Sequence, residues 1–230
     1  MYRNMIVKYI IPLLIFCVGV FSTSCDDMDA LHIGFLEEGE TIYAAKVDSA
    51  SVGPGNGRVK MELFINAQRI EKLRIYWNAY TDSIDFNVGG QVGEFSLMIE
   101  NLPEREYLFQ IVSFDKYGNR SLPFEATGRA CGEDYRNTLP NRHIENISKT
   151  EDGSILITWG AANDGAEKCV LTYTDATGQQ QVREVLATVL EDIIQNVQSG
   201  SSFTYYTIYK PAANSPDSFN TKEDSRDFPE

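Results

Sequence analysis

The fold is decided by the stretch Leu102-Pro103-Glu104-Arg105-Glu106-Tyr107-Leu108-Phe109-Gln110-Ile111, which is soon followed by Asp115-Lys116-Tyr117-Gly118-Asn119-Arg120-Ser121. In the first stretch Tyr107, Phe109 and Ile111 recur at every second position, so their side chains share one face of a strand. In the second stretch the Gly-Asn pair indicates a turn. The pattern predicts a β-strand with one covered face that ends in a tight turn.

The same alternation extends over residues 41–130. Two expected strands each collect apolar residues on one face: Val59, Met61, Leu63 and Ile65 in the first, and Leu73, Ile75 and Trp77 in the second. Glycine-rich turn sequences at residues 53–57 and 89–90 separate the strands. A parallel sheet would need helical segments between its strands, and none is visible here, so we expect an antiparallel β-sandwich.

The opening stretch resembles the E–F corner, F strand and F–G turn of a fibronectin type III module. This resemblance implies that the hydroxyl of Tyr107 bonds to the backbone upstream of its strand. A second copy follows: residues 155–159 match strand B with Trp159 as its core tryptophan, and residues 169–174 resemble strand C. Residues 197–203 repeat the corner, with Phe203 where the tyrosine would be.

The expected fold class is therefore all-β, with two tandem fibronectin type III-like (immunoglobulin-like) β-sandwiches. The boundaries are 41–131 for the first sandwich, 132–142 for a linker, 143–213 for the second sandwich and 214–230 for a polar C-terminal tail. One segment leaves two alternatives open. Its apolar residues recur at helical spacing between Val182 and Val197, whereas a sandwich needs two strands there.

The first residues read as a targeting signal. Arg3 and Lys8 precede an uncharged run at residues 9–21, which is shorter than the ~20 apolar residues that a membrane-spanning helix needs. We therefore expect a signal peptide at 1–24. The small residues Ser22-Thr23-Ser24 end at Cys25 and resemble the lipobox of bacterial lipoproteins, which implies that Cys25 is acylated and anchors the chain to membrane lipid. Residues 25–40 form the tether.

Acidic residues follow Cys25 directly, at Asp26, Asp27 and Asp29. They resemble the surface-export signal of Bacteroidota lipoproteins. The resemblance implies an outer-membrane protein that faces the cell exterior; the alternative is a lipoprotein that faces the periplasm.

Several further strings resemble a family of Bacteroidota lipoproteins of unknown function: residues 39–44, 74–78, 115–121 and 216–219. The resemblance implies a surface protein of a kind often linked to polysaccharide-utilisation systems. It supplies no catalytic residues.

Composition excludes several classes of function. The formal charge of −13 disfavours binding to nucleic-acid phosphates. The two histidines, His32 and His143, are far apart, and no spacing of Cys, His or Asp matches a metal site. We expect no cofactor, no metal and no catalysis.

Four other residues are singled out by their surroundings. Cys131 and Cys169 are in an exported chain and could form a disulfide, although a buried thiol suits Cys169 better. Ser49 in Asp-Ser-Ala and Ser83 in Asp-Ser-Ile resemble the O-glycosylation site of the same bacteria.

The leading hypothesis is a non-catalytic surface module that binds glycan or docks to glycan-uptake proteins, and the alternative is a structural spacer or adhesin component. A binder needs exposed aromatic residues in one patch. If Leu73, Ile75 and Trp77 face inward, the outer face of the same sheet carries four aromatic or apolar candidates: Tyr76, Tyr80, Val112 and Phe114. Apolar side chains gathered on an outer face indicate a covered surface, either within the chain or against a ligand.

Overall fold

The structure is a computed structural model that describes residues 42–230. The signal peptide, Cys25 and the acidic residues behind it lie outside the described residues. Residues Ala44–Glu230 form one compact unit, which contains both sandwiches. No helix in the described part of the chain is long and apolar enough to cross a membrane.

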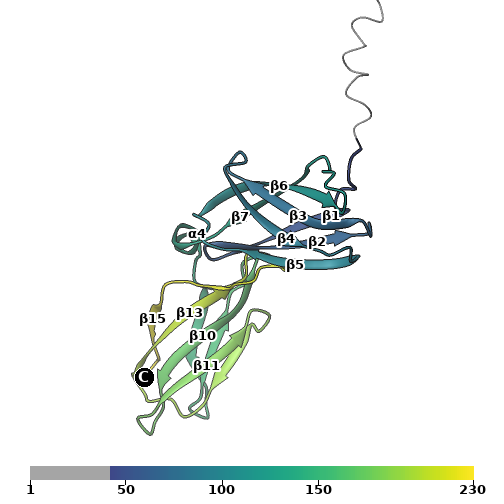
Figure 1. Cartoon of the computed structure of the whole chain (residues 1–230). Helices are drawn as coiled ribbons and strands as arrows, with labels where there is room; N and C mark the ends of the chain where they lie inside the picture. Colours follow the sequence, from purple (N-terminus) through teal and green to yellow (C-terminus); the bar gives the residue numbers. More distant parts are fainter. Residues whose placement is uncertain (1–41) are drawn as a thin grey trace, which may run out of the picture. The chain divides into compact units, whose positions relative to one another are not determined.

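The first sandwich has seven antiparallel strands (Figure 1). They are β1 (Ser49–Gly55), β2 (Arg58–Ile65), β3 (Ile70–Trp77), β4 (Asp82–Asn87), β5 (Gly93–Ile99), β6 (Arg105–Asp115) and β7 (Phe124–Ala130). One sheet has the order β1-β2-β5 and the other has the order β4-β3-β6-β7. This is the strand arrangement of a fibronectin type III-like sandwich, so the expected fold class is confirmed.

Alternation along the strands builds the core of the first sandwich. The residues expected on the inner faces of β2 and β3 are buried, and they pack with the inward residues of β6, Tyr107 and Phe109. Trp77, at the end of β3, is partly buried against the same core. The expected corner is also present, because the hydroxyl of Tyr107 donates a hydrogen bond of 2.8 Å to the carbonyl of Pro103.

A short helix and eight strands follow. They are α4 (Glu133–Thr138), β8 (Ile144–Lys149), β9 (Ile155–Trp159), β10 (Ala166–Thr174), β11 (Gln180–Leu186), β12 (Glu191–Ile194), β13 (Ser202–Tyr209), β14 (Phe219–Asn220) and β15 (Asp224–Asp227). One sheet has the order β12-β9-β8. The other has the order β11-β10-β13-β14, and β15 also pairs with β13. Trp159 is buried in the core, as expected.

The segment between residues 182 and 197 is not a helix. It forms the two strands β11 and β12, joined by a turn. Val185 and Ile194 are buried in the second core, whereas Val182 and Ile193 are exposed. Two short strands offset by a turn happen to give the spacing of three and four residues that a helix would give. The strand alternative is therefore the right one.

The expected polar tail at 214–230 needs correction. β15 pairs with β13 in an antiparallel register that places Asp224 opposite Tyr205 and Asp227 opposite Ser202. It takes the place of the last strand of the sandwich. Phe228 is buried in the second core, where its ring stacks on that of Phe203 with centroids 4.7 Å apart. The second sandwich therefore extends close to the C-terminus, because without β15 the edge of β13 and the aromatic core would face solvent.

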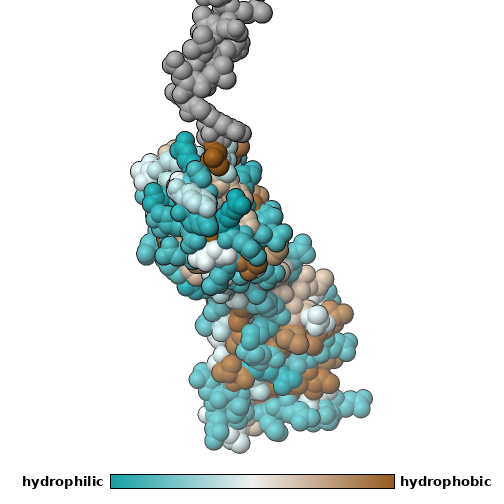
Figure 2. Space-filling view, turned by 45° about the vertical axis from the view of Figure 1, so that its right-hand side comes forward, coloured by the Kyte–Doolittle hydropathy of each residue, from teal (hydrophilic) through white to brown (hydrophobic). Residues whose placement is uncertain are grey.

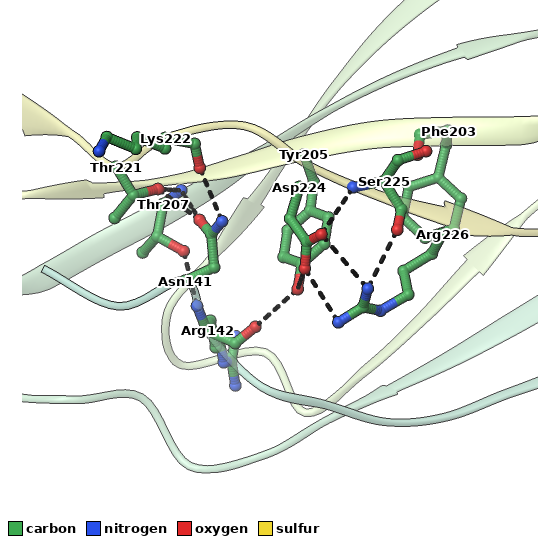
Figure 3. A network of polar contacts seen from close by, with 10 residues as sticks. All are labelled: Asn141, Arg142, Phe203, Tyr205, Thr207, Thr221, Lys222, Asp224, Ser225 and Arg226. Carbon is green, nitrogen blue, oxygen red and sulfur yellow. Dashed lines mark hydrogen bonds and ion pairs between the residues drawn. The ribbon is translucent and has the colours of Figure 1, made fainter.

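A polar network fixes this last strand and the linker to β13 (Figure 3). Asn141 accepts a hydrogen bond of 3.0 Å from the backbone of Thr207 and donates one of 2.7 Å to the carbonyl of Lys222. Arg142 donates its backbone N–H to the hydroxyl of Thr207 at 2.8 Å, and its buried guanidinium lies over the ring of Trp159. The end of the expected linker is thus part of the second sandwich.

Within the compact unit, the two sandwiches are tied by side-chain contacts. Asp217, in the loop before β14, accepts hydrogen bonds from the Arg58 guanidinium at 2.5 and 2.9 Å and from the Asn56 N–H at 2.9 Å. The carboxylate of Glu104 accepts hydrogen bonds from the backbone N–H groups of Asp134 and Tyr135 in α4. A bidentate arginine–carboxylate pair fixes orientation as well as distance.

Candidate binding surface on the first sandwich

The four residues of the expected patch lie on β3, β6 and the turn after β3, on the outer face of the sheet β4-β3-β6-β7. Register places Tyr76 opposite Gln110 and Arg74 opposite Val112. Val112 is only 7% exposed, so it is not available to a ligand. Among the other three, Tyr80 is 51% exposed, and Tyr76 and Phe114 are partly exposed.

Phe114 is covered on its outer side by cationic groups. The Lys72 ammonium lies 5.2 Å and the Arg74 guanidinium 5.8 Å from the centre of its ring. Both cations also contact the carboxylate of Asp85 on β4. Its oxygens lie 3.2 Å from Nζ of Lys72 and 2.5 Å from Nε of Arg74. The hydrogen bond from Arg74 lowers the pKa of Asp85 to about 2. At this end the outer face therefore carries two cations that share one carboxylate, rather than a free aromatic surface.

Tyr76 and Tyr80 form the aromatic part of the patch that remains open. Their ring centroids are 5.0 Å apart and the ring planes meet at 57°. The pair is surrounded by polar groups: Ser83 lies opposite Tyr76 on β4, and Gln110 lies opposite it on β6. Aromatic faces bounded by hydrogen-bonding groups are a common composition for a site that binds an amphipathic ligand.

The turn that presents Tyr80 has an unusual backbone. Asn78, Ala79 and Tyr80 are three consecutive residues with positive φ, at 52°, 52° and 66°. The left-handed region costs an L-residue about 1–2 kcal/mol, and asparagine less than most. Asn78 is held by hydrogen bonds to Asp82 at 2.5 Å and from Arg105 at 2.6 Å. These contacts stabilise a strained turn that brings Tyr80 beside Tyr76.

Leu108, on β6, points outward and is 48% exposed, as the alternation of its strand predicts. Sequence reasoning missed one residue at this surface, Arg105. Arg105 reaches the turn through Asn78 and also lies over the ring of Tyr107 at 4.8 Å. No local sequence signal identifies this role of Arg105, because it depends on the register between β3 and β6.

The remaining candidates are placed as follows. Ser49 and Ser83 are both exposed, on β1 and β4. Cys131 and Cys169 are both buried as free thiols, so no disulfide joins them. Among residues 42–230, no group of three or more His, Cys, Asp or Glu side chains is arranged to hold a metal ion.

Comparison with known protein families identifies the family of this chain. A family model described as DUF4998, a domain of unknown function, matches residues 25–219. The chain belongs to the DUF4998 family. A search of curated proteins gives no match.

Solved structures similar to this DUF4998 protein include fibronectin type III domains. The FN1–FN3 domains of chicken CNTN1 share 10% identity at a TM-score of 0.40, with 82% of this chain and 66% of that chain covered. A two-domain segment of chicken tenascin shares 12% identity at a TM-score of 0.33, with 81% of this chain and 100% of that chain covered. The fibronectin(III)-like modules of Clostridium thermocellum CbhA share 15% identity at a TM-score of 0.38, with 80% of this chain and 92% of that chain covered.

Proposed function

We propose that this DUF4998 protein is a non-catalytic surface lipoprotein whose first sandwich binds glycan through Tyr76 and Tyr80. The single observation that carries the proposal is the strained turn, which holds the ring of Tyr80 with its centroid 5.0 Å from that of Tyr76. Backbone strain of this kind clusters at functional sites, where surrounding contacts hold the strained residues in place. The apolar faces of pyranose rings stack on such exposed aromatic side chains.

The polar groups around the tyrosines fit the same ligand. Ser83, Gln110 and Asp82 offer a hydroxyl, an amide and a carboxylate near the pair. A sugar presents hydroxyl groups that donate to and accept from such side chains. Arg74 on this face is paired with Asp85, and the groups directly opposite Tyr76 are the uncharged side chains of Ser83 and Gln110, so we expect a neutral glycan.

The anchoring part of the proposal rests on the sequence around Cys25. The acylated cysteine would attach the chain to the outer membrane, and Asp26, Asp27 and Asp29 would direct it to the cell surface. Cys25→Ala should release the protein from the membrane fraction without detergent. Replacing all three aspartates with alanine should reduce its digestion by protease on whole cells while total protein stays constant. Continued membrane association of Cys25→Ala would overturn the anchor.

The binding proposal can be tested with residues 26–230, which include every residue that the structure describes. The protein is run in native gels that contain a soluble neutral polysaccharide, with xylan, mannan and mixed-linkage glucan tested in turn. It is produced in a host without O-glycosylation, because a sugar on Ser83 would lie beside Tyr76. We expect one of these polysaccharides to retard the protein, and Tyr76→Ala with Tyr80→Ala to remove the retardation.

Glycine substitutions in the turn separate binding from folding. Ala79→Gly and Tyr80→Gly both relieve a positive φ, so each should raise the free energy of unfolding by up to about 1 kcal/mol. Ala79→Gly should still bind, whereas Tyr80→Gly should not. Tyr117→Ala removes an exposed tyrosine from the turn after β6 and serves as the control. Equal binding by both glycine variants would overturn the site.

The spacer alternative has its own support in the contacts between the sandwiches. The bidentate pair of Arg58 with Asp217 and the Glu104 contacts to α4 would hold two modules in a fixed relation. If none of the polysaccharides retards the protein, a structural spacer is the function that these contacts support.

A further inference from the structure

The strand β11 carries an apolar surface that the proposed glycan site does not use. β11 is the edge strand of its sheet, with β10 as its neighbour on one side. Val182 is 67% and Leu186 60% exposed, and Glu184 lies between them on the same face. Figure 2 shows apolar residues gathered on the surface of the second sandwich. Large exposed apolar side chains on an edge strand favour contact with another chain.

The backbone of β11 also has hydrogen-bonding groups that face outward. The N–H of Ala187 donates to the carbonyl of Glu167 at 2.9 Å, which fixes the phase of the ladder between β10 and β11. In an antiparallel pair, alternate residues direct both backbone groups to the partner strand. The odd-numbered residues of β11 therefore pair with β10. The backbone groups of Val182 and Glu184 point to the free edge.

The equivalent strand of the first sandwich provides a comparison within the chain. β4 is also an edge strand, and it pairs with β3 as β11 pairs with β10. Its exposed residues are Ser83, Asp85 and Asn87. Polar and charged side chains protect such an edge from pairing with other strands. β11 occupies the same place in the same fold, but two of its exposed residues, Val182 and Leu186, are apolar, so its edge is less protected than that of β4.

The other sheet of the second sandwich also has exposed apolar side chains at its edge. β12 is the edge strand of that sheet, and Leu190 and Ile193 are exposed in and just before it. Arg183 of β11 donates hydrogen bonds of 2.8 and 2.5 Å to Asp192 of β12 and so ties the two edges together. The edges of both sheets on this side of the sandwich therefore present apolar side chains to solvent.

A second copy of the chain fits this edge poorly. An antiparallel pair of β11 strands that overlaps fully would place Arg183 opposite Arg183. The register that brings Val182 opposite Leu186 would place Glu184 opposite Glu184. Like charges in directly opposite positions destabilise a sheet. A register centred on Val182 leaves Leu186 without a partner.

We propose that β11 accepts an extended segment of a partner protein as an added antiparallel strand. The segment carries an apolar, a basic and an apolar residue at alternate positions. The apolar residues face Val182 and Leu186, and the basic residue faces Glu184. Lys168 already contacts Glu184 at 2.7 Å from the side of β10, so the partner's cation approaches the carboxylate from the free side. Backbone hydrogen bonds give such a complex its affinity and alternate side chains give it selectivity.

The probe is the capped, fluorescently labelled peptide Thr-Val-Thr-Lys-Thr-Val-Thr, added to residues 26–230. Its control has glutamate in place of lysine. We expect the lysine peptide to bind about tenfold more tightly by fluorescence anisotropy, and Glu184→Lys to reverse this preference. Val182→Lys with Leu186→Lys should abolish binding of both peptides. The matched control, Asn87→Lys with Thr127→Lys on the edge strands β4 and β7 of the first sandwich, should bind as the unchanged protein does.

Hydrogen exchange locates the complex. Bound lysine peptide should slow exchange of the backbone amides of Val182 and Glu184, and leave those of β4 unchanged. Three results overturn the proposal: no binding of the lysine peptide at concentrations of about 1 mM, binding that survives the double substitution on β11, or no added protection at Val182 and Glu184. A dimer that the same double substitution dissociates would make a second copy the occupant and would also overturn it.

Discussion

The hydroxyl of Tyr107 donates a hydrogen bond of 2.8 Å to the carbonyl oxygen of Pro103, four residues upstream. The ring of Tyr107 is buried and stacks on that of Phe109, with centroids 5.7 Å apart. The bond therefore joins the start of β6 to the chain that leads into it. In the second sandwich, Phe203 occupies the matching position of β13, and two later tyrosines anchor the strand instead. Tyr205 donates to the carbonyl of Arg142 at 3.4 Å and Tyr209 to that of Pro140 at 2.9 Å.

Tyr107→Phe tests the corner directly. The change removes one hydroxyl and leaves the Pro103 carbonyl without this donor, so we expect a loss of about 1 kcal/mol or more in the free energy of unfolding. Urea titration of residues 26–230 measures the change. Tyr117→Phe, at an exposed position in the next turn, is the matched control and should have no effect. An unchanged stability for Tyr107→Phe would show that the bond does not stabilise the corner.

The corner was predictable because its signal is local: a proline, a tyrosine and strict alternation within ten residues. Other features were harder to predict from the sequence. The helical spacing from Val182 to Val197 arises from residues that end on opposite faces of two strands, which no single periodicity describes. The burial of Val112 depends on how side chains on the outer face of its sheet pack, which alternation alone does not reveal. β15 was missed because its residues are polar, although a sandwich needs a strand after β13.

The two cysteines of the sandwiches should behave as shielded thiols. Burial raises the pKa of both Cys131 and Cys169, which lowers the fraction of reactive thiolate at neutral pH. In residues 26–230, which contain no other cysteine, a thiol reagent should react slowly with the folded protein and rapidly with two thiols in denaturant. Ser83→Cys adds an exposed thiol that should react at once. A denatured protein without reactive thiols would indicate a disulfide.

Stability should depend on pH through Asp217. The hydrogen bond from Arg58 holds the pKa of this carboxyl below its ordinary value, which is about 3.9 in an unfolded chain. The stabilisation is therefore complete above that value and is lost as the pH falls through the lowered pKa of the folded state. Asp217→Asn should reduce the free energy of unfolding by about 1 kcal/mol at pH 7, because the contact is partly exposed to solvent.

The pH dependence distinguishes this contact from a simple loss of packing. The difference between the unchanged protein and Asp217→Asn should be constant between about pH 5 and pH 8 and should shrink below about pH 4. Asp164→Asn, at an exposed position before β10, is the control and should match the unchanged protein throughout. A difference that stays constant down to pH 2 would mean that the charge of Asp217 contributes nothing.

Phe228 decides whether the last residues are a tail or a strand. It is 3% exposed, its ring meets that of Tyr173 at 88°, and its N–H donates to the carbonyl of Ser201 at 2.8 Å. Removing a buried aromatic ring lowers the free energy of unfolding by about 3–5 kcal/mol. For Phe228 we expect a value at the lower limit of this range, because residues near a chain end can fray. Phe228→Ala should therefore destabilise the second sandwich by about 3 kcal/mol.

The measurement needs a signal from the second sandwich alone. The chain has two tryptophans, so Trp77→Phe leaves Trp159, in the second core, as the fluorescent reporter of its unfolding in urea. In this background, Phe228→Ala should shift the unfolding midpoint strongly. Asp227→Ala, one residue earlier but exposed, should leave it almost unchanged. In a solvated tail the two substitutions would be equivalent, since neither side chain would contact the core. A large difference between them therefore requires that the chain pairs along β13 and returns Phe228 to the ring of Phe203.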